Sequence, residues 1–321
     1  MKNWLTIILT TTLIAGVSYP AASMQCMDDI HPLSIRYLGV GALDIHYKEQ
    51  RILTDPFYSP QTLWNIVTLD KYRPNPKAIK DALGPYQKNV DAVLVGHGHY
   101  DHLADLPAIK NFLKDDAVIV SSISSSNMIA PVYKKENRLA IQKKTTNQWH
   151  HIANGWVRVK AELSEHAPQV FNYNFASSTV DQPRSKLPRY IWSWKQGKNL
   201  SFMVDFLSEA HSNKVYKRIF IQTSASNFPM GYQPVSDGIQ VDSIFVAAAS
   251  FDNVDNYPTG LLKKYQPKET FLIHWENFFK PWFQDPSPMG TINFNELMNQ
   301  SKEAHSSGAI TVPNPKDCIY L

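Results

Sequence analysis

The sequence predicts an α/β fold whose strands come in two groups, with helices at several positions along the chain. Short apolar runs rich in β-branched residues, such as residues 92–95 and 243–249, have the length of buried strands. Alternating apolar residues at 43–47 and 157–163 indicate half-buried strands. Helical patterns are expected after residue 102 and near residues 126, 260 and 295. With 321 residues, 43% apolar and 19% charged, the chain is globular and long enough for an ample core.

The first residues are typical of a bacterial secretory signal peptide. Lys2 provides a positive start, residues 4–17 are apolar, and small residues at 21–23 suit cleavage. We therefore expect a signal peptide over residues 1–23 and a single periplasmic or secreted domain over 24–321. An uncleaved membrane anchor is the alternative, but the apolar core is shorter than the ~20 residues that a membrane span needs. No second stretch of the sequence could span a membrane, so we expect no transmembrane span after cleavage.

The net charge and the two cysteines indicate which binding partners and which cellular compartment to expect. The formal net charge of +4 falls by one when Lys2 is removed, which is too small and too evenly spread to predict nucleic-acid binding. Cys26 and Cys318 are the two cysteines of the chain. In an oxidising compartment they predict one disulfide bond that joins the ends of the mature chain, and two free thiols are the alternative.

Ligand-type side chains gather where the strand at 92–95 ends. His97, His99, Asp101 and His102 follow Gly96 within six residues. Because unpaired imidazoles and carboxylates are costly to bury, this cluster is a candidate site for Zn²⁺, Mn²⁺ or Fe. A His-rich surface loop is the alternative. Helical spacing continues to Leu113, and Asp105 is the expected N-cap ahead of Pro107.

Two other segments give weaker structural predictions. Residues 58–89 form a long connection with four prolines, and we expect its Trp64 and Tyr72 to pack in the core rather than to line substrate. Residues 190–194 and 200–206 flank a polar turn and predict a β-hairpin.

The sequence His97-Gly98-His99-Tyr100-Asp101-His102 resembles the H-x-H-x-D-H motif of the metallo-β-lactamase superfamily. Over residues 34–274 the chain is similar to the branch of metal-dependent hydrolases that includes sugar-phosphate lactonases and N-acyl-phosphatidylethanolamine phospholipase D. The resemblance implies a four-layer αββα sandwich. It also implies one metal at His97, His99 and His166, and a second at Asp101, His102 and His274. Asp55 resembles a residue that braces the metal site, and a plain turn residue is the alternative for it.

One landmark of this family is missing. The family normally has Gly-Asp-Thr or Gly-Asp-Ser after the strand at 218–221, and that Asp bridges the two metals. This chain has Gln222-Thr223-Ser224. A hydroxyl is a weaker ligand than a carboxylate. The alternatives are one tightly bound metal, a substitute ligand from Asp252 or Asp255, and a protein that has lost hydrolysis.

The resemblance implies a secreted hydrolase that cleaves a phosphodiester, lactone or other acyl bond in a small or lipid-like substrate. A Zn²⁺ ion, with Mn²⁺ or Fe as alternatives, would lower the pKa of a water molecule towards ~7. Asp101 is the catalytic candidate that orients this water, and a second metal would stabilise the developing oxyanion. A non-catalytic, metal-binding recognition protein is the second hypothesis, because the second metal site is degenerate.

Overall fold

Two mixed β-sheets face each other in the computed structural model, which describes Cys26 and residues 31–168, 175–280, 284–290 and 292–321. The expected signal peptide at 1–23 lies outside these residues. The first sheet has the order β14 (Cys318–Tyr320), β1 (Leu33–Tyr37), β2 (Leu43–Tyr47), β3 (Gln50–Thr54), β4 (Val90–Leu94), β5 (Leu113–Ser122), β6 (Arg138–Ile141). The second has the order β13 (Ala309–Thr311), β12 (Glu269–Ile273), β11 (Ser243–Ala247), β10 (Val215–Gln222), β9 (Asn199–Leu207), β8 (Val157–Ser164), β7 (Trp149–Ile152).

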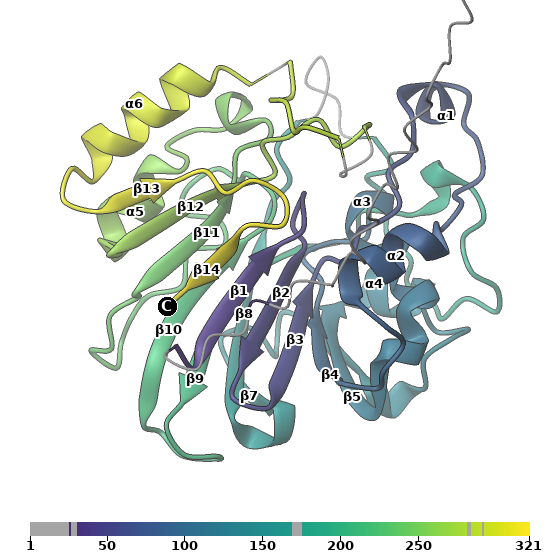
Figure 1. The fold of residues 1–321 in the computed structure, drawn as a ribbon, viewed down its shortest axis with the longest axis horizontal. Helices are drawn as coiled ribbons and strands as arrows, with labels where there is room; N and C mark the ends of the chain where they lie inside the picture. Colours follow the sequence, from purple (N-terminus) through teal and green to yellow (C-terminus); the bar gives the residue numbers. More distant parts are fainter. Residues whose placement is uncertain (1–25, 27–30, 169–174, 281–283, 291) are drawn as a thin grey trace, which may run out of the picture.

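Helices cover the outer faces of both sheets (Figure 1). Those beside the first sheet are α2 (Pro76–Leu83), α3 (Tyr100–Leu103) and α4 (Ile123–Met128), while α1 (Leu63–Val67) projects beyond them. Beside the second sheet lie α5 (Thr259–Tyr265) and α6 (Phe294–Ala304). Short 3₁₀ turns are η1 (Leu106–Phe112), η2 (Lys135–Asn137), η3 (Ala153–Gly155), η4 (Ile191–Ser193) and η5 (Phe251–Asn253). The predicted αββα sandwich is confirmed.

Alternation along the strands divides the core. Ala92 and Leu94 of β4 belong to the cluster between the sheets, whereas Val93 and Val95 belong to the cluster beneath the helices of the first sheet. Successive side chains of a strand point to opposite faces, so a strand covered on both faces is apolar throughout. No helix among the described residues is long and apolar enough to cross a bilayer.

The helix expected after the motif is broken into two pieces. α3 ends at Leu103, η1 covers Leu106–Phe112, and Leu113 already belongs to β5. Pro107 has no N–H to donate to the carbonyl of Leu103, so the first helix cannot continue through it. Asp105 occupies the N-cap position but its side chain does not cap η1; it accepts a hydrogen bond from the Tyr58 backbone N–H at 2.6 Å.

Two further expectations were wrong. Residues 190–194 contain the 3₁₀ turn η4 (Ile191–Ser193) rather than a strand. The strand β9 already has β8 and β10 on its two edges, and Ile191 N–H donates to the Asp70 carbonyl. Trp64 does not pack in the core: 73% of it is exposed. Tyr72 is buried, as expected.

The ends of the described chain are tied together. β14 pairs with β1, and a disulfide bond joins Cys26 to Cys318, whose Cα atoms lie 5.6 Å apart. The bond closes a loop with a sequence separation of 292 residues. In the chain-entropy account, a loop of this length stabilises the fold by about 5 kcal/mol.

Candidate metal centre

The loop after β4 is held in place by backbone contacts. Asp55 Oδ1 accepts a hydrogen bond from Gly96 N–H at 2.6 Å, and the Gln196 carbonyl accepts one from Gly98 N–H at 2.9 Å. A β-carbon at Gly98 would collide with the Lys195 carbonyl. The glycine between the two histidines therefore allows the loop to approach residues 195–196 while His97 and His99 point into the centre.

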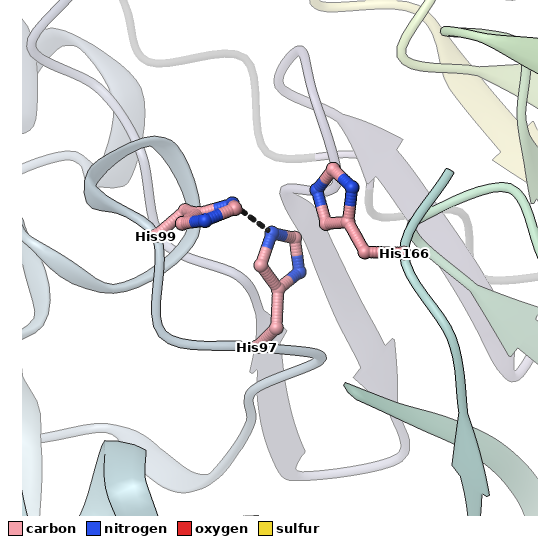
Figure 2. Close-up of side chains that lie close together, drawn as sticks. All are labelled: His97, His99 and His166. Atoms are coloured by element: carbon pink, nitrogen blue, oxygen red, sulfur yellow. Dashed lines mark hydrogen bonds between the residues drawn. The ribbon is translucent and has the colours of Figure 1, made fainter. Parts of the chain in front are cut away.

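Three imidazoles converge at this loop (Figure 2). His97 Nε2 and His99 Nδ1 lie 3.0 Å apart. His166, from the segment after β8, brings its ring centroid within 4.7 Å of that of His97 and 4.9 Å of that of His99. One ligand atom from each of the three lies within 4.8 Å of the others. We call this set the first triad.

Asp101, His102 and His274 form the second triad, again with ligand atoms within 4.8 Å of one another. Asp101 Oδ2 lies 3.5 Å from His102 Nε2 and 3.8 Å from His274 Nε2. The two triads adjoin, since the ring centroids of His97 and His102 are 3.9 Å apart. Asp55 Oδ2 lies 2.8 Å from His102 Nδ1, which is the arrangement that fixes the orientation of a ligating imidazole.

The backbone of His274 is held by residues that sequence reasoning did not identify. His274 directly follows β12 and has a left-handed φ of 54°. Its N–H donates to Tyr37 Oη at 2.8 Å, and that hydroxyl donates to Glu276 Oε2 at 2.6 Å. No sequence spacing connects Tyr37 to His274, because β1 and β12 belong to different sheets.

Electrostatics differ between the triads. Burial lowers the pKa of His97 and His99 well below the ordinary value, with neighbouring imidazoles acting in the same direction, and burial lowers the pKa of His166 to about 4. These rings are therefore neutral at pH 7. Burial also lowers the pKa of His102, but Asp101 and Asp55 outweigh it and raise the pKa overall.

The donor set fits a transition-metal cation. Neutral imidazoles and a carboxylate are ligands for Zn²⁺, Mn²⁺ and Fe. Buried ring nitrogens Nδ1 of His97 and His274 have no hydrogen-bond partner among the described residues. Two ring nitrogens that face each other at 3.0 Å, as in His97 and His99, also point towards a shared position.

Thr223 directly follows β10, where the family motif has its aspartate. It is buried, and its hydroxyl has no partner among the described residues. It lies against the loop, since a β-carbon at Gly96 would collide with Thr223 Oγ1 and lie 3.0 Å from Asp55 Oδ2. The two proposed substitute ligands, Asp252 and Asp255, are exposed and belong to neither triad.

Comparisons with known proteins agree with the observed fold. Residues 50–206 match the family described as a beta-lactamase superfamily domain. The metallo hydrolase Igni18 from the archaeon Ignicoccus hospitalis is 13% identical, with a TM-score of 0.56 over 90% of this chain and 98% of that chain. The family match is confined to residues 50–206, and over 90% of its length the chain shares the fold of Igni18.

Other solved structures share the fold. YhfI from Bacillus subtilis is 12% identical, with a TM-score of 0.54 over 91% of this chain and 100% of that chain. An isothiocyanate hydrolase from Delia radicum gut bacteria is 13% identical, with a TM-score of 0.50 over 90% and 99%. No curated protein matches the sequence. At these identities the likeness is one of fold.

Proposed function

We propose that this protein is a secreted, metal-dependent hydrolase whose single domain covers residues 24–321. The observation that carries the proposal is the convergence of two triads of ligand-type residues, all buried except the half-buried His166, at one end of the sandwich. Their types suit a divalent cation, and the imidazoles of the first triad are kept neutral by burial. Secretion is supported by the disulfide bond between Cys26 and Cys318, a bond that persists in oxidising compartments.

Each residue has a distinct part in the proposed reaction. His97, His99 and His166 would hold one cation, and Asp101, His102 and His274 would hold a second. A bound cation supplies a Lewis acid that makes a water molecule acidic at neutral pH. The Asp101 carboxylate oxygen that does not face the second cation would accept a proton from the attacking water, and Asp55 keeps the His102 ring in orientation through Nδ1. Burial raises the pKa of Asp101, which suits a carboxylate that takes up a proton.

The bond cleaved is a phosphodiester, a lactone or another acyl linkage. Each of these reactions attacks an electrophilic phosphorus or carbon with water and develops negative charge on oxygen, which cationic centres stabilise. The fold hosts several such reactions, and the site decides among them. A panel of chromogenic phosphodiesters, lactones and acyl esters, supplied with Zn²⁺, Mn²⁺ or Fe²⁺, is therefore the appropriate screen.

Turnover in this screen tests the proposal when His97→Ala and Asp101→Asn are compared with His151→Ala. His151 is exposed on β7 and belongs to neither triad, so it is a matched control for loss of an imidazole. We expect both site variants to lose more than about 100-fold in kcat/KM, because removing even the hydrogen-bond partners of ligands costs 10–100-fold. Equal activity in all three variants would contradict the proposal.

Thr223 favours a second candidate function, a metal-binding recognition protein without turnover. A hydroxyl replaces the bridging carboxylate of the family motif and has no partner among the described residues. Metal binding by the purified protein without turnover on any of the three substrate classes would support this alternative. Turnover that depends on His97 would exclude it.

A further inference from the structure

An exposed apolar surface surrounds α1, and the proposed hydrolysis does not require it. Leu63, Trp64, Val67 and Leu69 are all more than half exposed, and none of the residues of α1 is buried. Large apolar side chains grouped in this way on a short segment mark an interaction site. Figure 1 shows α1 at the upper edge of the molecule, away from both sheets.

The segment at 187–191 extends this surface. Lys71 and Tyr190 pair as an isolated antiparallel bridge, and Ile191 N–H donates to the Asp70 carbonyl. Tyr190 and Leu187 are themselves exposed. We define the α1 patch as the side chains of Leu63, Trp64, Val67, Leu69, Leu187 and Tyr190.

The α1 patch is presented by an anchored helix. Thr62 caps α1 in a reciprocal capping box with Asn65. Trp192 Nε1 donates to the Ile66 carbonyl at 2.8 Å, and Ile66 packs against the core beneath the first sheet. Ile66 already makes the inward contact of α1, so the side chains of the patch stay exposed while the helix is held in place.

Cations border the α1 patch. Residues 184–192 include Arg184, Lys186 and Arg189 and contain no acidic residue. Lys71, Lys186 and Arg189 form no ion pair among the described residues. The acidic residue of residues 62–73, Asp70, is bound by Arg73 at 2.7 Å. The border therefore carries uncompensated positive charge.

We propose that the α1 patch docks on the surface of an anionic phospholipid bilayer. Trp64 and its apolar neighbours enter the headgroup boundary, where tryptophan is favoured, while Lys71, Lys186 and Arg189 contact lipid phosphates. A stable protein partner typically covers about 800 Å² with 20–30 residues a side. Six side chains on a small projection are too few for such an interface, but they suit shallow insertion into lipid.

Docking there brings the bilayer near the metal centre. The ring of Trp192 lies 5.1 Å from that of Phe175, and the Phe175 carbonyl is 2.9 Å from His99 Nε2. Trp192, which holds α1 through the Ile66 carbonyl, is therefore connected to a residue of the first triad through Phe175. The docking is proposed independently of any reaction at that site.

Sedimentation with lipid vesicles tests the proposal without using turnover. The purified protein is mixed with vesicles of phosphatidylcholine alone, or with about a third of phosphatidylglycerol, at low and high salt. The test variant is Trp64→Ser with Val67→Ser. Tyr216→Ser is the matched control, because Tyr216 is also exposed and lies at the far end of β10 from Thr223.

We expect the wild type and Tyr216→Ser to sediment with the anionic vesicles and to dissociate at high salt. The double variant should bind at least about ten-fold more weakly. Equal binding by the double variant and the wild type would overturn the proposal, as would no binding of the wild type to any vesicle. A wild-type dimer that the double variant dissolves, without vesicle binding, would overturn it in favour of a second copy of the chain. Circular dichroism of each variant checks that the fold is retained.

Discussion

The two triads of the metal centre differ in how many surrounding residues hold their members in place. Two members of the first triad come from one tripeptide, and the rings of all three are kept neutral by burial. The second triad combines Asp101 and His102 of α3 with His274, which follows β12 of the other sheet. Asp55 orients His102, and Tyr37 and Glu276 hold the backbone at His274.

This difference indicates that the two triads bind their cations with unequal affinities. A second cation close to the first is repelled by it, and the family motif offsets that repulsion with a carboxylate between the metals. Here Thr223 contributes a neutral hydroxyl instead. We therefore expect the first triad to bind one cation tightly and the second triad to bind another weakly.

The largest expected effect is a loss of tight metal binding when the first triad is altered but not when the second is. His97→Ala should abolish tight metal binding and turnover, whereas His274→Ala should keep the tightly bound cation and lose only the weak one. Isothermal titration with Zn²⁺ measures both affinities. If His97→Ala and His274→Ala lost tight binding equally, the triads would not be independent and the comparison would fail.

Asp55→Asn should weaken the second cation by about 10–100-fold, because it alters the partner that orients His102 through Nδ1. Affinity of the first cation should change much less. Asp252→Asn is the matched control, since Asp252 is exposed and belongs to neither triad. The same titration detects the difference, and a loss confined to the first cation would contradict the assignment of Asp55 to the second triad.

Thr223→Asp sharpens the comparison by restoring a carboxylate. The new charge lies beside Asp55 and the loop at Gly96, so it should destabilise the metal-free protein and strengthen binding of the second cation about ten-fold. Ser224→Asp controls for added charge one residue away. Unchanged affinity in Thr223→Asp, with the fold intact by circular dichroism, would show that position 223 does not face the cations.

The smallest expected effect is on stability and comes from Asp105, which lies two residues after α3. Burial raises its pKa from 3.8 to about 6 in the folded chain, against an opposing hydrogen bond from Tyr58 N–H. Asp105 therefore binds its proton more tightly when folded, so it lowers the unfolding free energy as pH rises from about 4 to about 6, by on the order of 2–3 kcal/mol.

Asp105→Asn should remove this part of the pH dependence and leave the metal stoichiometry unchanged. Urea denaturation between pH 4 and pH 7 measures it. An identical slope in the variant and the wild type would show that Asp105 is not protonated on folding.

Much of the fold, and two members of the first triad, could be predicted from local sequence. Buried strands such as β4 and β11 are continuous apolar runs, and the histidines of the loop are close in sequence, so spacing alone brings them together. His166 and His274 required the family resemblance. The role of Tyr37 could not be found from the sequence, because its contacts with His274 and Glu276 cross between two sheets.

The errors have physical causes that also lie in tertiary contacts. Pro107 interrupts a helix that the apolar spacing predicted to be continuous. Trp64 was expected in the core because large aromatic side chains are usually buried, but Ile66 makes the inward contact of α1 and leaves Trp64 exposed. Sequence patterns do not show which apolar residue of a one-turn helix faces inward.

Metal content per chain tests the central claim most directly. Elemental mass spectrometry is performed on protein purified without added metal, and again after exposure to Zn²⁺ followed by gel filtration. We predict close to one cation per chain under both conditions, lost in His97→Ala and retained in His274→Ala. Two cations that survive gel filtration would contradict the weak second triad, and no cation at all would contradict the metal centre itself.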